Sequence, residues 1–143
     1  MRVLVQKLSE KSKDIGYAHE GDSGLDLYST QSMELKPLER KLVPTGIKIE
    51  MPKEIEAQIR PKSGLAINHG ITLLNTPGTI DSSYRGEIKV IAINLGSENY
   101  KIEEGQKIAQ MVFAKVEHPE LILVKEIGKT SRNEDGFGST GLK

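Results

Sequence analysis

The chain has 143 residues, no cysteine, and equal numbers of acidic and basic side chains, so its formal net charge is zero. This length predicts a single domain, and the lack of cysteine excludes disulfides, thiol catalysis and sulfur-ligated metals. The neutral charge balance argues against a general polyanion binder, so no nucleic-acid partner is expected. Residues 1–8 do not resemble a signal peptide, and no apolar run approaches the roughly 18 residues of a membrane span. We therefore expect a cytoplasmic chain without a membrane partner.

The first sixty residues carry the pattern of short β-strands. Apolar or alternating runs occupy residues 3–5, 25–29, 33–35, 41–43, 46–51 and 55–60, and a polar loop covers residues 9–22. In the second run, Leu25 and Leu27 should face the side opposite Asp26. Strands about ten residues apart with turns between them are typical of a β-sandwich or barrel.

One short helix is expected between Ser63 and Gly70. Serine is a common N-cap residue, and glycine commonly follows the last helical turn. The start of a helix exposes backbone N–H groups that bind phosphate well when a cation such as Lys62 stands beside it. The alternative is a connector with a serine cap, and the residue types favour neither.

Residues 75–87, which read NTPGTIDSSYRGE, lie between apolar strands at 71–74 and 88–93. Their Pro-Gly and Ser-Ser pairs predict that the chain doubles back between two sheet strands. The stretch also carries an amide, an acid and an aromatic ring, which a turn does not need. An ordinary hairpin is the competing interpretation.

Three more strands are expected at residues 100–102, 106–116 and 121–124. In the strand at 106–116, Ile108, Gln110 and Val112 should face one way, with Ala109, Met111 and Phe113 facing the other. Because Gln110 then shares a face with apolar residues, its amide requires a hydrogen-bonding partner.

The last residues, 130–143, combine an arginine, a single phenylalanine and the run GFGSTG. This composition is typical of a frayed chain end. The same residue types would also suit a flap that closes over a phosphate. Composition alone leaves both interpretations open: a β domain, residues 1–129, is followed by either a frayed end or a flexible C-terminal flap, residues 130–143.

Five stretches resemble, in order, the motifs of the trimeric dUTPase family. They are SGLDL at 23–27, RPKSGLA at 60–66, the stretch 75–87, GQKIAQ at 105–110, and 132–141. The resemblance covers nearly the whole chain. It implies a jelly-roll-like all-β fold with one short helix, a homotrimer, and hydrolysis of dUTP to dUMP and pyrophosphate with Mg²⁺ on the triphosphate. This reaction keeps uracil out of DNA and supplies dUMP for thymidylate synthesis. In the family the first, second and fourth motifs of a site come from one subunit, the third from a second, and the tail from a third.

The resemblance also implies a role for each matching residue. Asp81 would be the base for the attacking water, Ser63 the donor to the α–β bridging oxygen, and Gln110 a contact of the α-phosphate. Tyr84 would lie against the deoxyribose, Arg132 would bind the γ-phosphate, and Phe137 would stack on the uracil. Asp26 would hold Mg²⁺ through water. The remaining substrate-binding residues would be Lys62, Gly64, Asn75, Gly78, Thr79, Ile80, Gly138 and Ser139.

The sequence departs from the usual family pattern at four positions. Lys62 stands where arginine is normal, which keeps the charge but loses the bidentate fork. Thr79 stands where valine or leucine is common, Asn133 where glycine is common, and Ser23 where alanine is frequent. These departures bear on affinity and on closure of the tail.

Two other functions compete with dUTP hydrolysis. A dCTP deaminase shares the fold, but that family has an Arg-Ser-Ser stretch where this chain has residues 60–64. The second alternative is a non-catalytic binding or regulatory protein with the same fold. The presence of Asp81, Tyr84 and Arg132 argues against lost catalysis.

Overall fold

The computed structural model describes residues 1–143 and contains eleven strands and one short helix. The predicted all-β class with one short helix is therefore confirmed. The protein has no helix with the length and apolar character that a membrane span requires. The elements are β1 (Leu4–Lys7), β2 (Leu25–Tyr28), β3 (Met33–Leu35), β4 (Arg40–Pro44), β5 (Ile47–Glu50), β6 (Ile55–Arg60), α1 (Ser63–His69), β7 (Ile71–Leu73), β8 (Gly78–Ile80), β9 (Lys89–Asn94), β10 (Tyr100–Ile102) and β11 (Lys107–Lys115).

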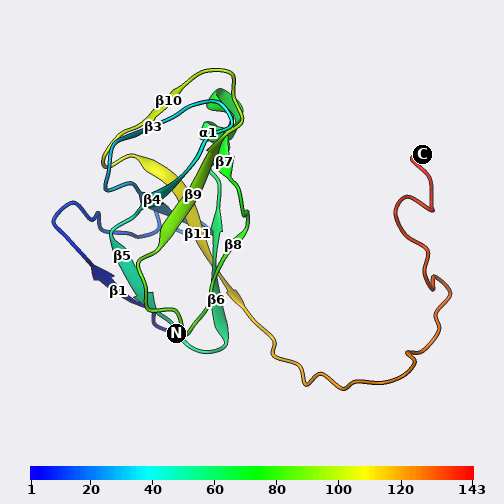
Figure 1. Ribbon diagram of the computed structural model, residues 1–143. Helices are drawn as coiled ribbons and strands as arrows, with labels where there is room; N and C mark the ends of the chain where they lie inside the picture. The colour runs from blue at the N-terminus through cyan, green and yellow to red at the C-terminus, as the bar shows by residue number, and fades with distance from the viewer.

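The strands form four antiparallel sheets whose neighbours are mostly distant in sequence. The largest sheet has the order β2-β11-β6-β8, and a second has the order β4-β9-β7. Two pairs, β1-β5 and β3-β10, complete the body (Figure 1). Such crossed connections are typical of jelly-roll folds. The sheets remain separate, so the body is a sandwich and not a closed barrel.

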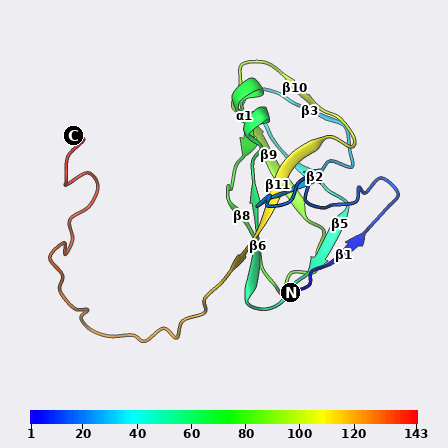
Figure 2. The same ribbon diagram turned by 180° about the vertical axis from the view of Figure 1, so that it is seen from behind.

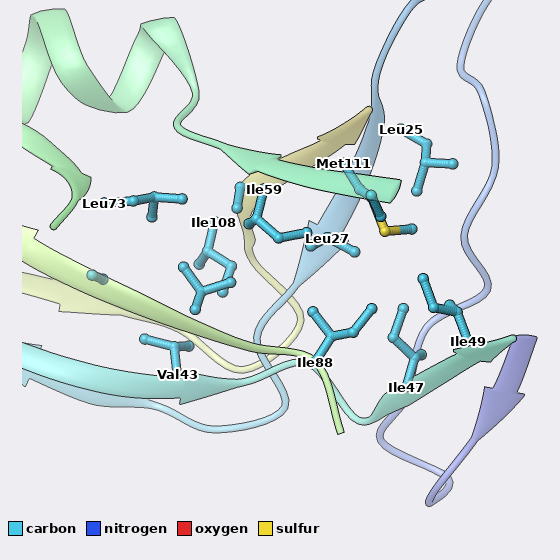
Figure 3. Close-up of a cluster of buried hydrophobic side chains, with 14 of the residues drawn as sticks. Leu25, Leu27, Val43, Ile47, Ile49, Ile59, Leu73, Ile88, Ile108 and Met111 are labelled. Atoms are coloured by element: carbon cyan, nitrogen blue, oxygen red, sulfur yellow. The ribbon is translucent and has the colours of Figure 1, made fainter. Parts of the chain in front are cut away.

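A cluster of 19 buried apolar residues lies between the layers (Figure 3). It forms because strand side chains alternate between the two faces of a sheet. In β6, Ile55, Ala57 and Ile59 are buried, whereas Glu56 and Gln58 are only partly covered. Burial of a side chain the size of isoleucine contributes about 1.5–3 kcal/mol, so this alternation fixes which face of β6 meets the core.

The stretch 75–87 is more than a hairpin turn. The flanking strands β7 and β9 do pair antiparallel, with Leu73 opposite Ala92. Between them, however, Gly78–Ile80 forms β8, which crosses to the other layer and pairs with β6. The stretch therefore links the two main sheets, and Asp81 follows directly after β8.

The strand predicted at 121–124 is absent. Leu121, Ile122, Leu123 and Val124 are all exposed, and no strand of the chain pairs with them. An isolated strand is not stable in water, because it needs partners for its backbone groups and for one apolar face. Beyond β11 the chain extends away from the body (Figure 1, and Figure 2 from behind).

Candidate functional site

Three adjacent strands bring the first, second and fourth motifs together. Gln110 of β11 lies opposite Asp26 of β2 on one side and opposite Arg60 of β6 on the other. Residues directly opposite each other on neighbouring strands share one face of the sheet. The structure thus aligns Asp26, Gln110 and Arg60 in one row across the sheet.

Asp26 is the electrostatic centre of this row. Its side chain is 17% exposed, Lys62 Nζ donates to Oδ1, and Lys107 Nζ donates to Oδ2 at 2.8 Å. Burial works to raise the pKa of Asp26, but hydrogen bonds and charges from Lys107 and Lys62 together hold this pKa below its usual value. Two lysines around one ionised carboxylate leave a net positive charge, which suits a phosphate ligand.

Gln110 has the partner that its position requires. The side chain is half-buried, and Nε2 donates to the carbonyl oxygen of Pro61 at 3.0 Å. The predicted face pattern of this strand is wrong at Ile108, which is buried together with Ala109. The pairing with β2 shifts by one residue between Lys107 and Ala109, so a β-bulge interrupts the alternation.

The helix starts beside this cluster. Ser63 is the first helical residue, and the N-cap is Lys62, without a side-chain capping bond. The expectation that Ser63 is itself the N-cap is therefore wrong by one position. Ser63 and Gly64 are exposed, so their N–H groups and the serine hydroxyl face solvent next to the Lys62 cation. Gly70 ends the helix as predicted, with φ 68°.

A second group of predicted residues lies along β8. Gly78 pairs with Ile59 and lies near Asn75, since a Cβ built on Gly78 would come 3.4 Å from Asn75 Nδ2. Asp81 and Tyr84 follow the strand, and the Tyr84 amide donates to the Asp81 carbonyl oxygen at 3.0 Å. A groove of about 450 Å³ is lined by Leu42, Thr79, Ile80, Asp81, Tyr84, Glu87, Lys89 and Ile91.

Asp81 of the second group and Lys62 of the first lie at opposite ends of β6. Ile80 pairs with Ala57 near the start of β6, and Asp81 follows it, whereas Lys62 lies just past the end of the strand at Arg60. With a rise of about 3.3 Å per residue, Asp81 and Lys62 are roughly 15–20 Å apart along the strand. One chain therefore does not bring both residues to the same phosphate group.

The predicted tail residues lie apart from both groups (Figure 1). Arg132 Nε donates to the carbonyl oxygen of Asp135 at 2.7 Å, and Phe137 is fully exposed. Gly138 has φ 88°, and the Ser139 amide donates to the Gly136 carbonyl oxygen at 3.0 Å. Asn133 has φ 43°, a conformation that asparagine adopts more readily than most residues other than glycine.

Sequence reasoning missed Lys107. An unbroken strand would point Lys107 away from the face that carries Gln110, because residues three apart face opposite sides. The bulge places Lys107 on the same face as Gln110. No residue type at the bulge itself indicates it in the sequence. The position of Lys107 inside the fourth motif was the one available signal.

Comparisons with known proteins agree on one family. The family model described as dUTPase matches residues 10–141. The deoxyuridine 5'-triphosphate nucleotidohydrolase of Clostridium novyi is 59% identical over 142 residues, covering 99% of this chain and 100% of the relative. The Clostridium kluyveri protein of the same name is 55% identical over 141 residues, with 99% of each chain covered.

Solved structures agree with this assignment. A Staphylococcus bacteriophage 80alpha dUTPase with dUPNHPP has a TM-score of 0.92, 25% identity and 99% coverage of both chains. A phage phi11 dUTPase, whose structure concerns the coordination of a structural Mg(II) ion, has a TM-score of 0.82 at 24% identity, covering 88% of this chain and 98% of the other. Matched along nearly its whole length by the family model and by these relatives, the chain belongs to the dUTPase family.

Proposed function

We propose that this chain is a dUTP diphosphatase, which hydrolyses dUTP to dUMP and pyrophosphate. The reaction keeps uracil out of DNA and supplies dUMP for thymidylate synthesis. The observation that carries the proposal is the 59% identity to the Clostridium novyi nucleotidohydrolase over the full length of both chains. All five motifs lie within that matched length. A cytoplasmic location suits an enzyme of the nucleotide pool.

Three residues would carry the chemistry. Asp81 orients and deprotonates the water that attacks the α-phosphorus, a task for a carboxylate because phosphoryl transfer depends mostly on positioning and charge stabilisation. Ser63 donates to the bridging oxygen of the leaving pyrophosphate. Gln110 donates one amide hydrogen to Pro61, and its second amide hydrogen is available for the α-phosphate.

The nucleoside would be recognised along β8. Asn75 and the backbone from Gly78 to Ile80, including Thr79, read the edge of the uracil, and Tyr84 leaves no space for a 2′-hydroxyl. A site built for such hydrogen bonds rejects a mismatched edge by roughly 10⁴-fold, because the mismatch leaves buried polar groups unpaired. Lys62 and the backbone at Gly64 bind the phosphates at the start of α1.

A complete site would draw on more than one chain. Asp81 and Lys62 lie at opposite ends of β6. They could therefore surround one nucleotide only if they come from different subunits of a homotrimer. The exposed apolar residues 121–124 support the same assembly, since they lack a partner within the chain. The β domain, residues 1–129, then supplies two parts of the site, and residues 130–143 supply a flap from a third chain.

The flap would close on the bound nucleotide. Arg132 would exchange the Asp135 carbonyl oxygen for the γ-phosphate, with which a guanidinium forms charge-assisted, bidentate bonds. Phe137, fully exposed without a nucleotide, would stack on the uracil, and Gly138 and Ser139 would lie along the nucleotide.

Asp26, the carboxylate between Lys62 and Lys107, is the group that would face a magnesium ion arriving with the nucleotide. No group of three or more acidic or histidine side chains forms a metal cage in this chain. Mg²⁺ needs no such cage, because it keeps several waters and binds through one or two carboxylates and substrate phosphates. Asp26 would hold it through water. When bound, the ion neutralises charge on the triphosphate.

Pyrophosphate release from dUTP and from the four common dNTPs, with and without Mg²⁺, tests the proposal. We expect turnover of dUTP alone, dependent on Mg²⁺. Ammonia release from dCTP would favour the deaminase instead. Tight nucleotide binding without turnover would favour the regulatory protein.

A further inference from the structure

Lys107 is a charged residue at the Asp26 cluster for which the proposed reaction has no role. Its Nζ lies 2.8 Å from Oδ2 of Asp26, while Lys62 occupies the other carboxylate oxygen. The two lysines therefore approach one carboxylate from two elements, β11 and the N-cap of α1.

The bulge in β11 gives Lys107 this position. Gln110 pairs with Asp26, and Lys107 pairs with Tyr28, two residues along β2, so three steps in β11 match two steps in β2. Ile108 is the extra residue, and its side chain points into the buried cluster (Figure 3). Bulges commonly re-aim a side chain beside an active site. Here the bulge turns Lys107 onto the face of Asp26 and Gln110.

The two lysines are not equivalent. The Lys62 side chain is 29% exposed and stands beside Ser63 at the helix start, whereas the Lys107 side chain is 50% exposed. If Lys62 binds phosphate, it must release Asp26 at least in part. A carboxylate that is only 17% exposed is destabilised when it loses a cationic partner. Lys107 is the cation that stays.

We propose that Lys107 is a positioning residue, which holds Asp26 in place while Lys62 turns from Asp26 to the phosphate of the nucleotide. This inference rests on the proposed function. Lys107 acts through Asp26 and does not itself contact the nucleotide. The bulge at Ile108 is then a functional feature of β11, since an unbroken strand would leave Asp26 with Lys62 alone.

Binding of a non-hydrolysable dUTP analogue with Mg²⁺, measured by calorimetry on the full-length chain, tests this role. Lys107→Met should raise both Kd and KM about tenfold, the effect typical of losing a residue that orients a ligand group. The value of kcat should change far less. Lys107→Arg should restore wild-type Kd. Lys101→Met is the matched control, because Lys101, on β10, forms an exposed ion pair with Glu103 at 2.9 Å. Should Lys107→Met not fold, Lys107→Gln replaces it.

A double-mutant cycle separates positioning from direct contact. In an Asp26→Asn background, Lys107→Met should raise Kd no further, because the carboxylate through which Lys107 acts is gone. Additive losses would contradict the proposal, as would an unchanged Kd for Lys107→Met alone. A wild-type chain that neither binds the analogue nor hydrolyses dUTP would overturn the proposed function instead.

Discussion

Gly24 and the Gln110 side chain lie in direct contact, with no space between them for a methyl group. A Cβ built on Gly24 would come 2.5 Å from Oε1 of Gln110. Oε1 is the far end of a flexible side chain, so a substitution would displace the amide and leave the strands in place. Displacement would disturb the bond from Nε2 to Pro61, which is 3.0 Å long.

Gly24→Ala should therefore reduce activity with little effect on folding. We expect kcat/KM for dUTP to fall about tenfold, since misplacing one positioned donor costs about 1.4 kcal/mol or more. Gly16→Ala is the control, because a Cβ on Gly16 meets nothing within 4 Å. Steady-state kinetics and thermal unfolding of both variants provide the measurement. Equal kcat/KM for the two variants would remove Gln110 from the site.

Replacing the proposed base should separate turnover from binding. Asp81→Asn keeps the shape of the side chain but removes its basicity, so kcat should fall about 10²–10⁴-fold. Affinity for a non-hydrolysable dUTP analogue should stay within a few-fold of wild type. Asp14→Asn, which alters an exposed carboxylate paired with Lys7, should leave both quantities unchanged. Near wild-type turnover of Asp81→Asn would show that another group activates the water.

Tyr84 should control the choice between dUTP and UTP. Its hydroxyl donates to the Glu87 carbonyl oxygen at 3.0 Å, and this bond helps to orient the ring. Tyr84→Ala opens space for a 2′-hydroxyl and should raise UTP hydrolysis relative to dUTP. Tyr84→Phe retains the ring and should preserve the preference. The ratio of kcat/KM values for the two nucleotides decides, and an unchanged ratio in Tyr84→Ala would place discrimination elsewhere.

The tail should be mobile until nucleotide binds. Its bonds are local, such as Arg132 to Asp135, and closure must offset the ordering of about ten residues at roughly 1–2 kcal/mol each. Deletion from Thr130 onward should leave a folded protein with severely reduced turnover, because the tail would exclude water and clamp the γ-phosphate.

Protease digestion with and without the non-hydrolysable analogue monitors that closure. Phe137→Ala should lose part of the activity and of the protection, whereas Leu142→Ala, also at a fully exposed position, should behave as wild type. Full activity of the truncated chain, or equal cleavage in both states, would be incompatible with a flap.

Strands with an alternating pattern were predictable because the pattern reports which side chains a sheet buries. The run from Ile55 to Arg60 matches β6 at both ends. The three-residue strand β8 was not predictable, since Gly78 and its neighbours also read as turn residues and their pairing partner, β6, is distant in sequence. The run 121–124 has the right composition for a strand but no partner within the chain.

Within the site, residue types were easier to predict than contacts. Asp26, Lys62 and Gln110 were identified by the family motifs, and the structure brings them together. The contact between Lys107 and Asp26 depends on one extra residue in β11, which changes the facing of the strand without any local signal. The separation of Asp81 from Lys62 likewise follows from the register of β8 on β6.

The length of β6 has a genetic consequence. Because the strand keeps Asp81 and Lys62 apart within one polypeptide, a chain defective at Asp81 and a chain defective at Lys62 carry complementary lesions. In a symmetric homotrimer whose sites take these residues from different subunits, random mixing of the two chains would leave about a quarter of the sites with both residues intact. Two alleles that are each inactive would then rescue one another when they are expressed in the same cell.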